Sequence, residues 1–242
     1  MGSNAQTIPT YKIYCQSSNL IAMNKFEVGS NFLSLGQLDK AAENFKLALY
    51  EDSLFCDAWD NLAVVMRRKG DYNKALTYYL KSYNINNRND VACTNGAEIL
   101  LLANKTELAF KWFSKAVEID SANPEGYFGQ AKCLVKIQEF DTALLALSKA
   151  KLLYIKQYKN EVHDANFLEG IIYFSKGDIS KAILMLDQEY NFYSENPSMN
   201  YFLGFCYLDP AFENIELAKV YLLKAQKGGM TLDNKTLDRI GK

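Results

Sequence analysis

A repeat of alanines at intervals of 34 residues is the feature that most constrains the fold. Ala41, Ala75, Ala109 and Ala143 follow one another at that interval, and Ala182 and Ala218 continue the series after slightly wider gaps. Large apolar residues lie four positions after these alanines: Phe45, Tyr79, Phe113, Leu147, Leu186 and Leu222. Small residues lie twelve positions before the first five: Gly29, Ala63, Ala97, Ala131 and Gly170. A period of this length predicts a chain of stacked supersecondary units.

Within each unit the spacing of these residues predicts two antiparallel helices. Intervals of three, four and seven residues keep apolar side chains on one helix face, and the small residues let the two helices approach closely. Gly36, Gly70 and Gly177 lie five positions before their alanines and are expected to end the first helix with a positive φ. Asn123-Pro124 and Asn196-Pro197 predict capped helix starts.

The second unit, residues 56–89, carries the motif most completely. Its matching residues are Trp59, Leu62, Ala63, Gly70, Tyr72, Ala75 and Tyr79. This pattern resembles the tetratricopeptide repeat family, and the last unit, with Leu217-Ala218 and Gly228-Gly229, is also similar to Sel1-like repeats. Glu189 departs from the family, which usually has an apolar or small residue at that position.

The resemblance implies an all-α chain, a right-handed superhelical solenoid of stacked antiparallel helix pairs. We expect an N-terminal tail at 1–17 and a solenoid at 18–229. The six units of that solenoid are expected at about 22–55, 56–89, 90–123, 124–157, 163–196 and 197–229. Residues 230–242 are expected to form a capping helix or a tail, with Asp233 as the cap and Leu237 and Ile240 facing the last unit.

Composition narrows the classes of function. The chain has 27 Lys and Arg against 28 Asp and Glu, which does not favour a nucleic-acid partner. No apolar run is long enough to predict a membrane span. His163 is the single histidine, and neither a catalytic motif nor a metal-binding or cofactor-binding motif is present. We therefore expect no catalytic residues, no metal and no cofactor, and we expect that the chain is not an enzyme.

The cysteines bear on the compartment. They are scattered along the chain without a Cys-x-x-Cys pair: Cys15, Cys56, Cys93, Cys133 and Cys206. We expect them to be unpaired, buried residues in a reducing compartment, which favours the cytoplasm. The alternative is an exported protein, if Ser3-Asn4-Ala5 is the remnant of a removed signal.

In the tetratricopeptide repeat family the first helix of each unit lines a concave groove. By helical phase, the residues facing that groove in the second and third units are Asp57, Asp60, Asn61, Val64, Arg67, Arg68, Val91, Thr94, Asn95, Glu98 and Leu101. Asn61 and Asn95 occupy equivalent positions, and an asparagine amide can both donate to and accept from the backbone of a bound peptide. We expect Asn61, Asn95, Arg67 and Arg68 to belong to a peptide-binding surface.

The C-terminal half of the groove is more apolar. The residues expected to face a bound segment there are Phe128, Phe167, Ile171, Phe174, Tyr201, Phe202 and Phe205. A contiguous apolar patch of this kind usually marks an interface. Two alternatives stay open: some of these side chains belong to the core, or the apolar tail at 8–14 occupies the groove.

One family function is not expected. Members that bind the acidic C-termini of heat-shock chaperones use lysine and arginine together with two asparagines. The matching positions here are Phe26, Ser30, Asn61, Val91 and Asn95, which include no cation for a terminal carboxylate.

The resulting hypothesis is a non-enzymatic protein–protein interaction module that binds a peptide or helical segment of an unidentified partner in its groove. The alternative is a structural scaffold that uses the apolar groove for self-association into a homo-oligomer.

Overall fold

The computed structural model describes residues 15–158 and 163–241, and all regular secondary structure in those two ranges is helical. The chain forms two compact units: unit 1 ends at Ser121 and unit 2 begins at Ala122. Of the sequence expectations, the apolar segment at 8–14 and Ser3-Asn4-Ala5 lie outside the described residues, as do residues 159–162 of the gap between the expected fourth and fifth units. Within those residues no helix combines the length and the apolar character needed to cross a bilayer.

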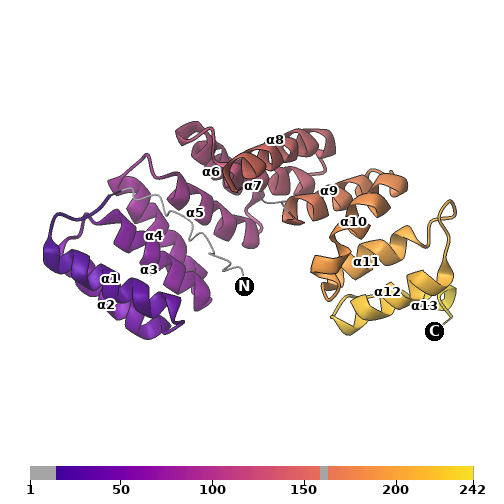
Figure 1. Ribbon diagram of the computed structural model, residues 1–242, viewed down its shortest axis with the longest axis horizontal. Coiled ribbons are helices and arrows are strands. Elements are labelled where there is room, and N and C mark those ends of the chain that lie inside the picture. The colour runs from indigo at the N-terminus through magenta and orange to yellow at the C-terminus, as the bar shows by residue number, and fades with distance from the viewer. Residues whose placement is uncertain (1–14, 159–162, 242) are drawn as a thin grey trace, which may run out of the picture. The chain divides into compact units, whose positions relative to one another are not determined.

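Unit 1 consists of three helix pairs. Its helices are α1 (Leu20–Ser34), α2 (Leu38–Glu51), α3 (Cys56–Arg68), α4 (Tyr72–Ile85), α5 (Asp90–Leu102) and α6 (Thr106–Ile119). The most extensive packing joins α1 to α2, α3 to α4, and α5 to α6, and each pair also contacts the next (Figure 1).

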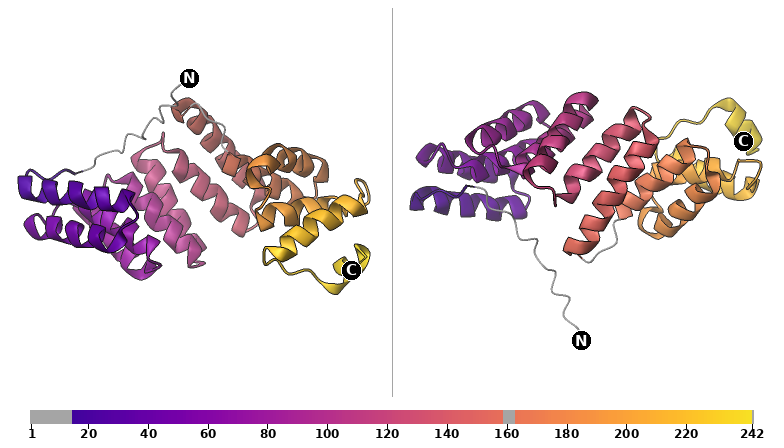
Figure 2. Two further views of the ribbon diagram at one scale, coloured as in Figure 1. Left: turned by 60° about the horizontal axis from the view of Figure 1, so that its bottom comes forward. Right: turned by 90° about the horizontal axis from the view of Figure 1, so that it is seen from above.

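Unit 2 repeats this arrangement and adds a short terminal helix. Its helices are α7 (Pro124–Lys136), α8 (Phe140–Tyr158), α9 (His163–Ser175), α10 (Ile179–Tyr193), α11 (Pro197–Cys206), α12 (Ile215–Lys227) and α13 (Asn234–Arg239). The views in Figure 2 show the α9–α10 and α11–α12 pairs, in orange to yellow, lying side by side. The expected all-α architecture of antiparallel helix pairs is confirmed.

Close contact between the two helices of a pair depends on small residues in the first helix. A Cβ placed on Gly29 would lie 2.8 Å from the Phe45 ring, and one on Gly204 would lie 2.5 Å from Leu222. Phe45 and Leu222 are completely buried. A larger side chain at either glycine would therefore force the two helices of its pair apart.

The turns inside the pairs require a left-handed backbone residue. Gly36, Gly70 and Gly177 have φ of 70°, 79° and 80°, so the prediction of positive φ at these glycines is confirmed. The equivalent positions in the third and fourth units are Asn104 (φ 56°) and Gln138 (φ 64°). Asparagine tolerates this conformation, whereas glutamine is strained in it because its Cβ approaches the carbonyl oxygen.

The helix starts have the caps that the sequence predicts. The Oδ1 of Asn123 accepts a hydrogen bond from the Gly126 amide at 3.0 Å, and Pro124 is the first residue of α7. Asn196 caps α11 in the same way. Asp233 caps α13 by accepting from the Thr236 amide at 2.7 Å, so this cap is also confirmed.

The end of unit 2 is covered by α13. Ile240 is buried and packs with Leu222 and Leu232, and the partly buried Leu237 joins the same cluster. Arg239 donates hydrogen bonds to the Leu208 carbonyl and to Glu213. These contacts shield apolar side chains of the last helix pair from water.

The departure at Glu189 has a structural reason. The Glu189 carboxylate is buried on α10. Its Oε2 lies 2.5 Å from the Nδ1 of His163, and its Oε1 accepts a hydrogen bond from the side-chain amide of Asn166 at 2.7 Å. Both partners lie on α9. A polar contact therefore replaces apolar packing at this one position between the two helices of the pair.

The cysteine prediction is wrong for two of the five residues. Cys15 and Cys56 form a disulfide, with Cα atoms 5.6 Å apart. Ser17 donates a hydrogen bond to Asp52, and the Asn19 amide donates to the Glu51 carbonyl at 3.3 Å. These bonds hold the segment before α1 against the end of α2 and bring Cys15 next to the start of α3. As expected, Cys93, Cys133 and Cys206 are buried and do not belong to this disulfide.

The strained turn at Gln138 gives a stability prediction. Gln138→Gly is expected to raise the free energy of unfolding by about 1 kcal/mol, because glycine removes the Cβ clash in a left-handed conformation. Urea unfolding followed by circular dichroism measures the change. The matched control is Gln138→Ala, which shortens the side chain but keeps the Cβ and should gain nothing. Equal stability of the glycine and alanine variants would contradict the assignment.

Candidate functional site

The residues expected to bind a partner all lie on first helices of their pairs. Asn61, Arg67 and Arg68 are on α3 and Asn95 is on α5, both in unit 1. In unit 2, α7 carries Phe128, α9 carries Phe167, Ile171 and Phe174, and α11 carries Tyr201, Phe202 and Phe205. The two sets are described separately.

In unit 2 the structure brings four of these aromatic residues together. The Phe174 ring on α9 meets the Phe202 ring on α11 edge to face, with centroids 5.3 Å apart. Tyr201 lies 5.6 Å from Phe202 and 4.7 Å from Phe205. We call Phe174, Phe202, Tyr201 and Phe205 the aromatic row. It runs across two neighbouring first helices.

Each ring of the aromatic row is half-buried, so the row has a packed side and an accessible side. Phe174 and Phe202 pack against the core formed by Leu186, Met199 and Leu203. Tyr201 and Phe205 pack against the cluster at the end of the unit. The alternative that some of these side chains belong to the core therefore holds in part, because the same rings contribute to the core and keep exposed surface.

The other apolar residues of this set stay outside the row. Phe167 stacks on Tyr193 at 5.3 Å, and the Tyr193 hydroxyl donates a hydrogen bond to Asp164. Burial and this hydrogen bond raise the pKa of Tyr193, so its phenol stays protonated as the donor. Ile171 is half-buried on the same helix as Phe167. Phe128 lies beneath the Lys132 ammonium at 5.4 Å.

In unit 1 several polar candidates already have partners. The Asn61 amide donates to the Asp57 carbonyl of its own helix at 2.9 Å. The Arg68 guanidinium donates to the Leu33 carbonyl near the end of α1 at 3.2 Å. Among the described residues the half-buried Asn95 side chain has no hydrogen-bond partner. Asn95 is thus a candidate in unit 1 whose polar side chain is free for a ligand.

Three residues expected to face a groove are instead buried. Asp60, Thr94 and Leu101 have exposed fractions of 9%, 7% and 6%. The expectation that these three side chains face an open groove is wrong, because they are buried within the unit. Arg67, by contrast, is half-buried at the end of α3.

Asp60 belongs to a buried polar network that the sequence did not reveal. The side-chain amide of Asn89 donates to Asp60 Oδ2 at 2.6 Å and to the Ser82 hydroxyl oxygen at 3.0 Å. The Ser82 hydroxyl in turn donates to the Cys56 carbonyl at 3.2 Å. Asn89 also caps α5 by accepting from the Ala92 amide. The network therefore links α3, α4 and α5, and Asp60 Oδ1 has no partner within the described residues.

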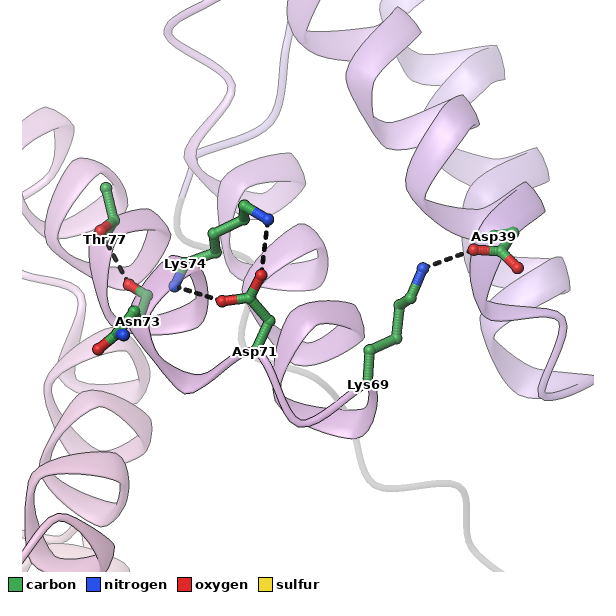
Figure 3. A network of polar contacts seen from close by, with 6 residues as sticks. All are labelled: Asp39, Lys69, Asp71, Asn73, Lys74 and Thr77. Atoms are coloured by element: carbon green, nitrogen blue, oxygen red, sulfur yellow. Dashed lines mark hydrogen bonds and ion pairs between the residues drawn. The ribbon is translucent and has the colours of Figure 1, made fainter.

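A hollow of about 560 Å³ lies on the outer side of unit 1, between α2 and α4. Its lining includes Asp39, Glu43, Leu47, Tyr50, Lys69 and Tyr78. At its rim Lys69 pairs with Asp39 at 2.5 Å and Lys74 with Asp71 at 2.6 Å (Figure 3). These pairs neutralise the rim lysines, so the hollow does not present them as free anion ligands.

Across the residues that the structure describes, no group of three or more His, Cys, Asp and Glu side chains is arranged to hold a metal ion.

Comparison with known protein families matches one of the expected units. Residues 56–89 match the family model described as tetratricopeptide repeat. A search of curated proteins finds no match.

Solved structures share the fold at low sequence identity. A chain of the APC/C hetero-tetramer Cut9-Hcn1 aligns with a TM-score of 0.78 and 16% identity over 91% of this chain and 43% of that chain. PilF of Pseudomonas aeruginosa aligns with a TM-score of 0.72 and 17% identity over 86% and 92%. YrrB, described as a tetratricopeptide repeat protein with an unusual peptide-binding site, aligns with a TM-score of 0.57 and 21% identity over 74% and 90%. This chain therefore spans less than half the length of the first of these. At such identities the alignments establish the fold alone.

The buried carboxyl of Asp60 gives a prediction about pH. Burial raises the pKa of Asp60 from 3.8 to about 7 in the folded chain. Below pH 3.8 this carboxyl is protonated in both the folded and the unfolded chain, and its full contribution to the free energy of unfolding is present. That contribution is lost as the pH rises through 7, because the unfolded chain ionises the carboxyl freely whereas the folded chain must ionise it in a buried position. The free energy of unfolding is expected to fall by about 4 kcal/mol over this range. Urea unfolding at a series of pH values measures this, and Asp60→Asn should flatten the dependence. An unchanged slope in that variant would place the titrating group elsewhere.

Proposed function

We propose that this chain, in which residues 56–89 match a tetratricopeptide repeat, is a non-enzymatic scaffold that binds an apolar segment of a partner protein on the aromatic row. The aromatic row is the observation that carries this proposal. Four aromatic side chains lie in mutual contact on two neighbouring first helices, and each keeps part of its surface open to solvent.

The packing of the row suits it to binding. Because Phe174 and Phe202 are held by core residues behind them, their rings lose little conformational entropy when a partner covers them. Aromatic anchors at the centre of an interface also dominate binding energies in most complexes. The Tyr201 hydroxyl adds a polar group that can orient the bound segment.

Unit 1 carries polar candidates of its own. The side-chain amide of Asn95 is free. The side-chain oxygen of Asn61 is also available, although the side-chain nitrogen of Asn61 donates to the Asp57 carbonyl. We propose that these two asparagines contact the backbone of a peptide bound to unit 1, whereas Arg68 acts mainly in stabilising the end of α1. The printed description of YrrB, a protein of the same fold, supports peptide binding as a function of such a chain.

A phage-displayed library of random peptides, selected on the full chain, tests this function. Enriched peptides should carry an aromatic or branched aliphatic residue, and Phe202→Ser should weaken their binding about tenfold or more because an anchor site is lost. For selected peptides that bind independently of Phe202, Asn61→Ala combined with Asn95→Ala should weaken binding. Fluorescence anisotropy measures the dissociation constants.

Two controls make the result interpretable. Phe212→Ser removes an exposed ring from the loop between α11 and α12, outside the row, and should bind like the parent. Phe174→Leu keeps an apolar side chain against the core while removing a ring, so a loss of affinity there cannot be attributed to unfolding. If the parent is instead a dimer that Phe202→Ser converts to a monomer, the row serves self-association and the peptide-binding proposal fails.

A further inference from the structure

The second surface of interest is an apolar stripe on the outer side of α8. Leu145, Leu152 and Ile155 are 74%, 62% and 55% exposed. Spacings of seven and three residues place them on one face of the helix. The opposite face of α8 carries the buried residues Ala143 and Leu147. The helix therefore has one apolar face in the core and another in water, and we call Leu145, Leu152 and Ile155 the α8 stripe.

The repeat architecture does not require this stripe. Leu145 lies two positions after a repeat alanine, and the equivalent positions in unit 1 are the exposed polar residues Glu43, Thr77 and Lys111. In unit 2 the same position is aliphatic and exposed in all three pairs: Leu145, Leu184 (54%) and Val220 (51%). Stability of the fold cannot explain the difference, because unit 1 folds with polar residues there. An interaction surface explains it.

The charges beside the stripe indicate what covers it. Lys149 and Lys156 are exposed one turn after Leu145 and Leu152, and neither has an ion-pair partner in the described part of the chain. Lys151, on the other flank of the stripe, is already paired with Glu169 at 2.7 Å. The stripe is thus bordered on one side by two free cations.

We propose that the α8 stripe binds an amphipathic helix of a partner protein whose apolar side is flanked by carboxylates. Two exposed leucines one heptad apart match the contact spacing of a partner helix packed along α8. Carboxylates on that helix would face Lys149 and Lys156 with opposite charge. A second copy of α8 packed antiparallel would instead place the lysines of both helices on the same side of the contact, where they repel. Two lysines and three aliphatic residues are also a small set for binding a lipid surface, which usually requires a polybasic patch.

Two synthetic helical peptides test this proposal on the full chain. Both carry leucines at heptad spacing, and they differ only in having glutamates or lysines beside the leucines. In anisotropy titrations the glutamate peptide should bind at least tenfold more tightly than the lysine peptide. Leu152→Ser should weaken the glutamate peptide at least tenfold, and Lys149→Glu with Lys156→Glu should reverse the preference.

Matched controls separate this surface from the proposed function. Tyr50→Ser removes a side chain that is 85% exposed on α2 and should leave binding of the glutamate peptide unchanged. Phe202→Ser in the aromatic row should also leave it unchanged, so either proposal can fail without the other.

Three results would overturn the proposal. The first is equal binding of the two peptides, or no binding of the glutamate peptide. The second is binding of the chain to phosphatidylserine-containing vesicles that Leu152→Ser abolishes, which would assign the stripe to a membrane surface. The third is a parent dimer that Leu152→Ser converts to a monomer, which would assign it to a second copy of the chain.

Discussion

The close contact between the two helices of each pair is the constraint on which the rest of the structure depends. Gly170 allows α9 to approach α10 so closely that a Cβ there would lie 2.7 Å from Leu186, and Gly204 plays the same part between α11 and α12. A helix pair cannot bury its apolar face alone, so its remaining apolar side chains must pack against the next pair. Pairing and stacking together decide which helix faces remain in water.

The helix faces that this packing leaves exposed to water differ between the two units. In unit 2 the first helices leave the aromatic row half-exposed, and the outer side of α8 leaves Leu145, Leu152 and Ile155 in water. In unit 1 the candidate polar groups are largely bonded within the unit, as for Asn61 and Arg68. The two surfaces of unit 2 lie on different helices, so the partners that we propose for them need not compete.

The sequence period predicted the structural features that occur in every repeat and missed the features that occur once. The alanine period predicted the helix pairs, and the glycines five positions earlier predicted the left-handed turns, because each repeat needs the same geometry. The disulfide from Cys15 to Cys56 depends on the path of a segment before the first repeat, so the repeat pattern does not predict it. The burial of Asp60 depends on Asn89 and Ser82 from two neighbouring helices, a contact specific to one junction. For the site, helical phase placed the aromatic rings on the right helices, whereas their mutual contacts and partial burial required the structure.

The central claim is that the first helices of unit 2 present the surface that binds a partner. Hydrogen–deuterium exchange of the full chain, with and without a peptide selected on it, tests this most directly. The account predicts slower exchange in α9 and α11 when the peptide is bound, with α12 and the helices of unit 1 far less affected. Protection confined to other helices, or none in α9 and α11 at saturating peptide, would contradict it.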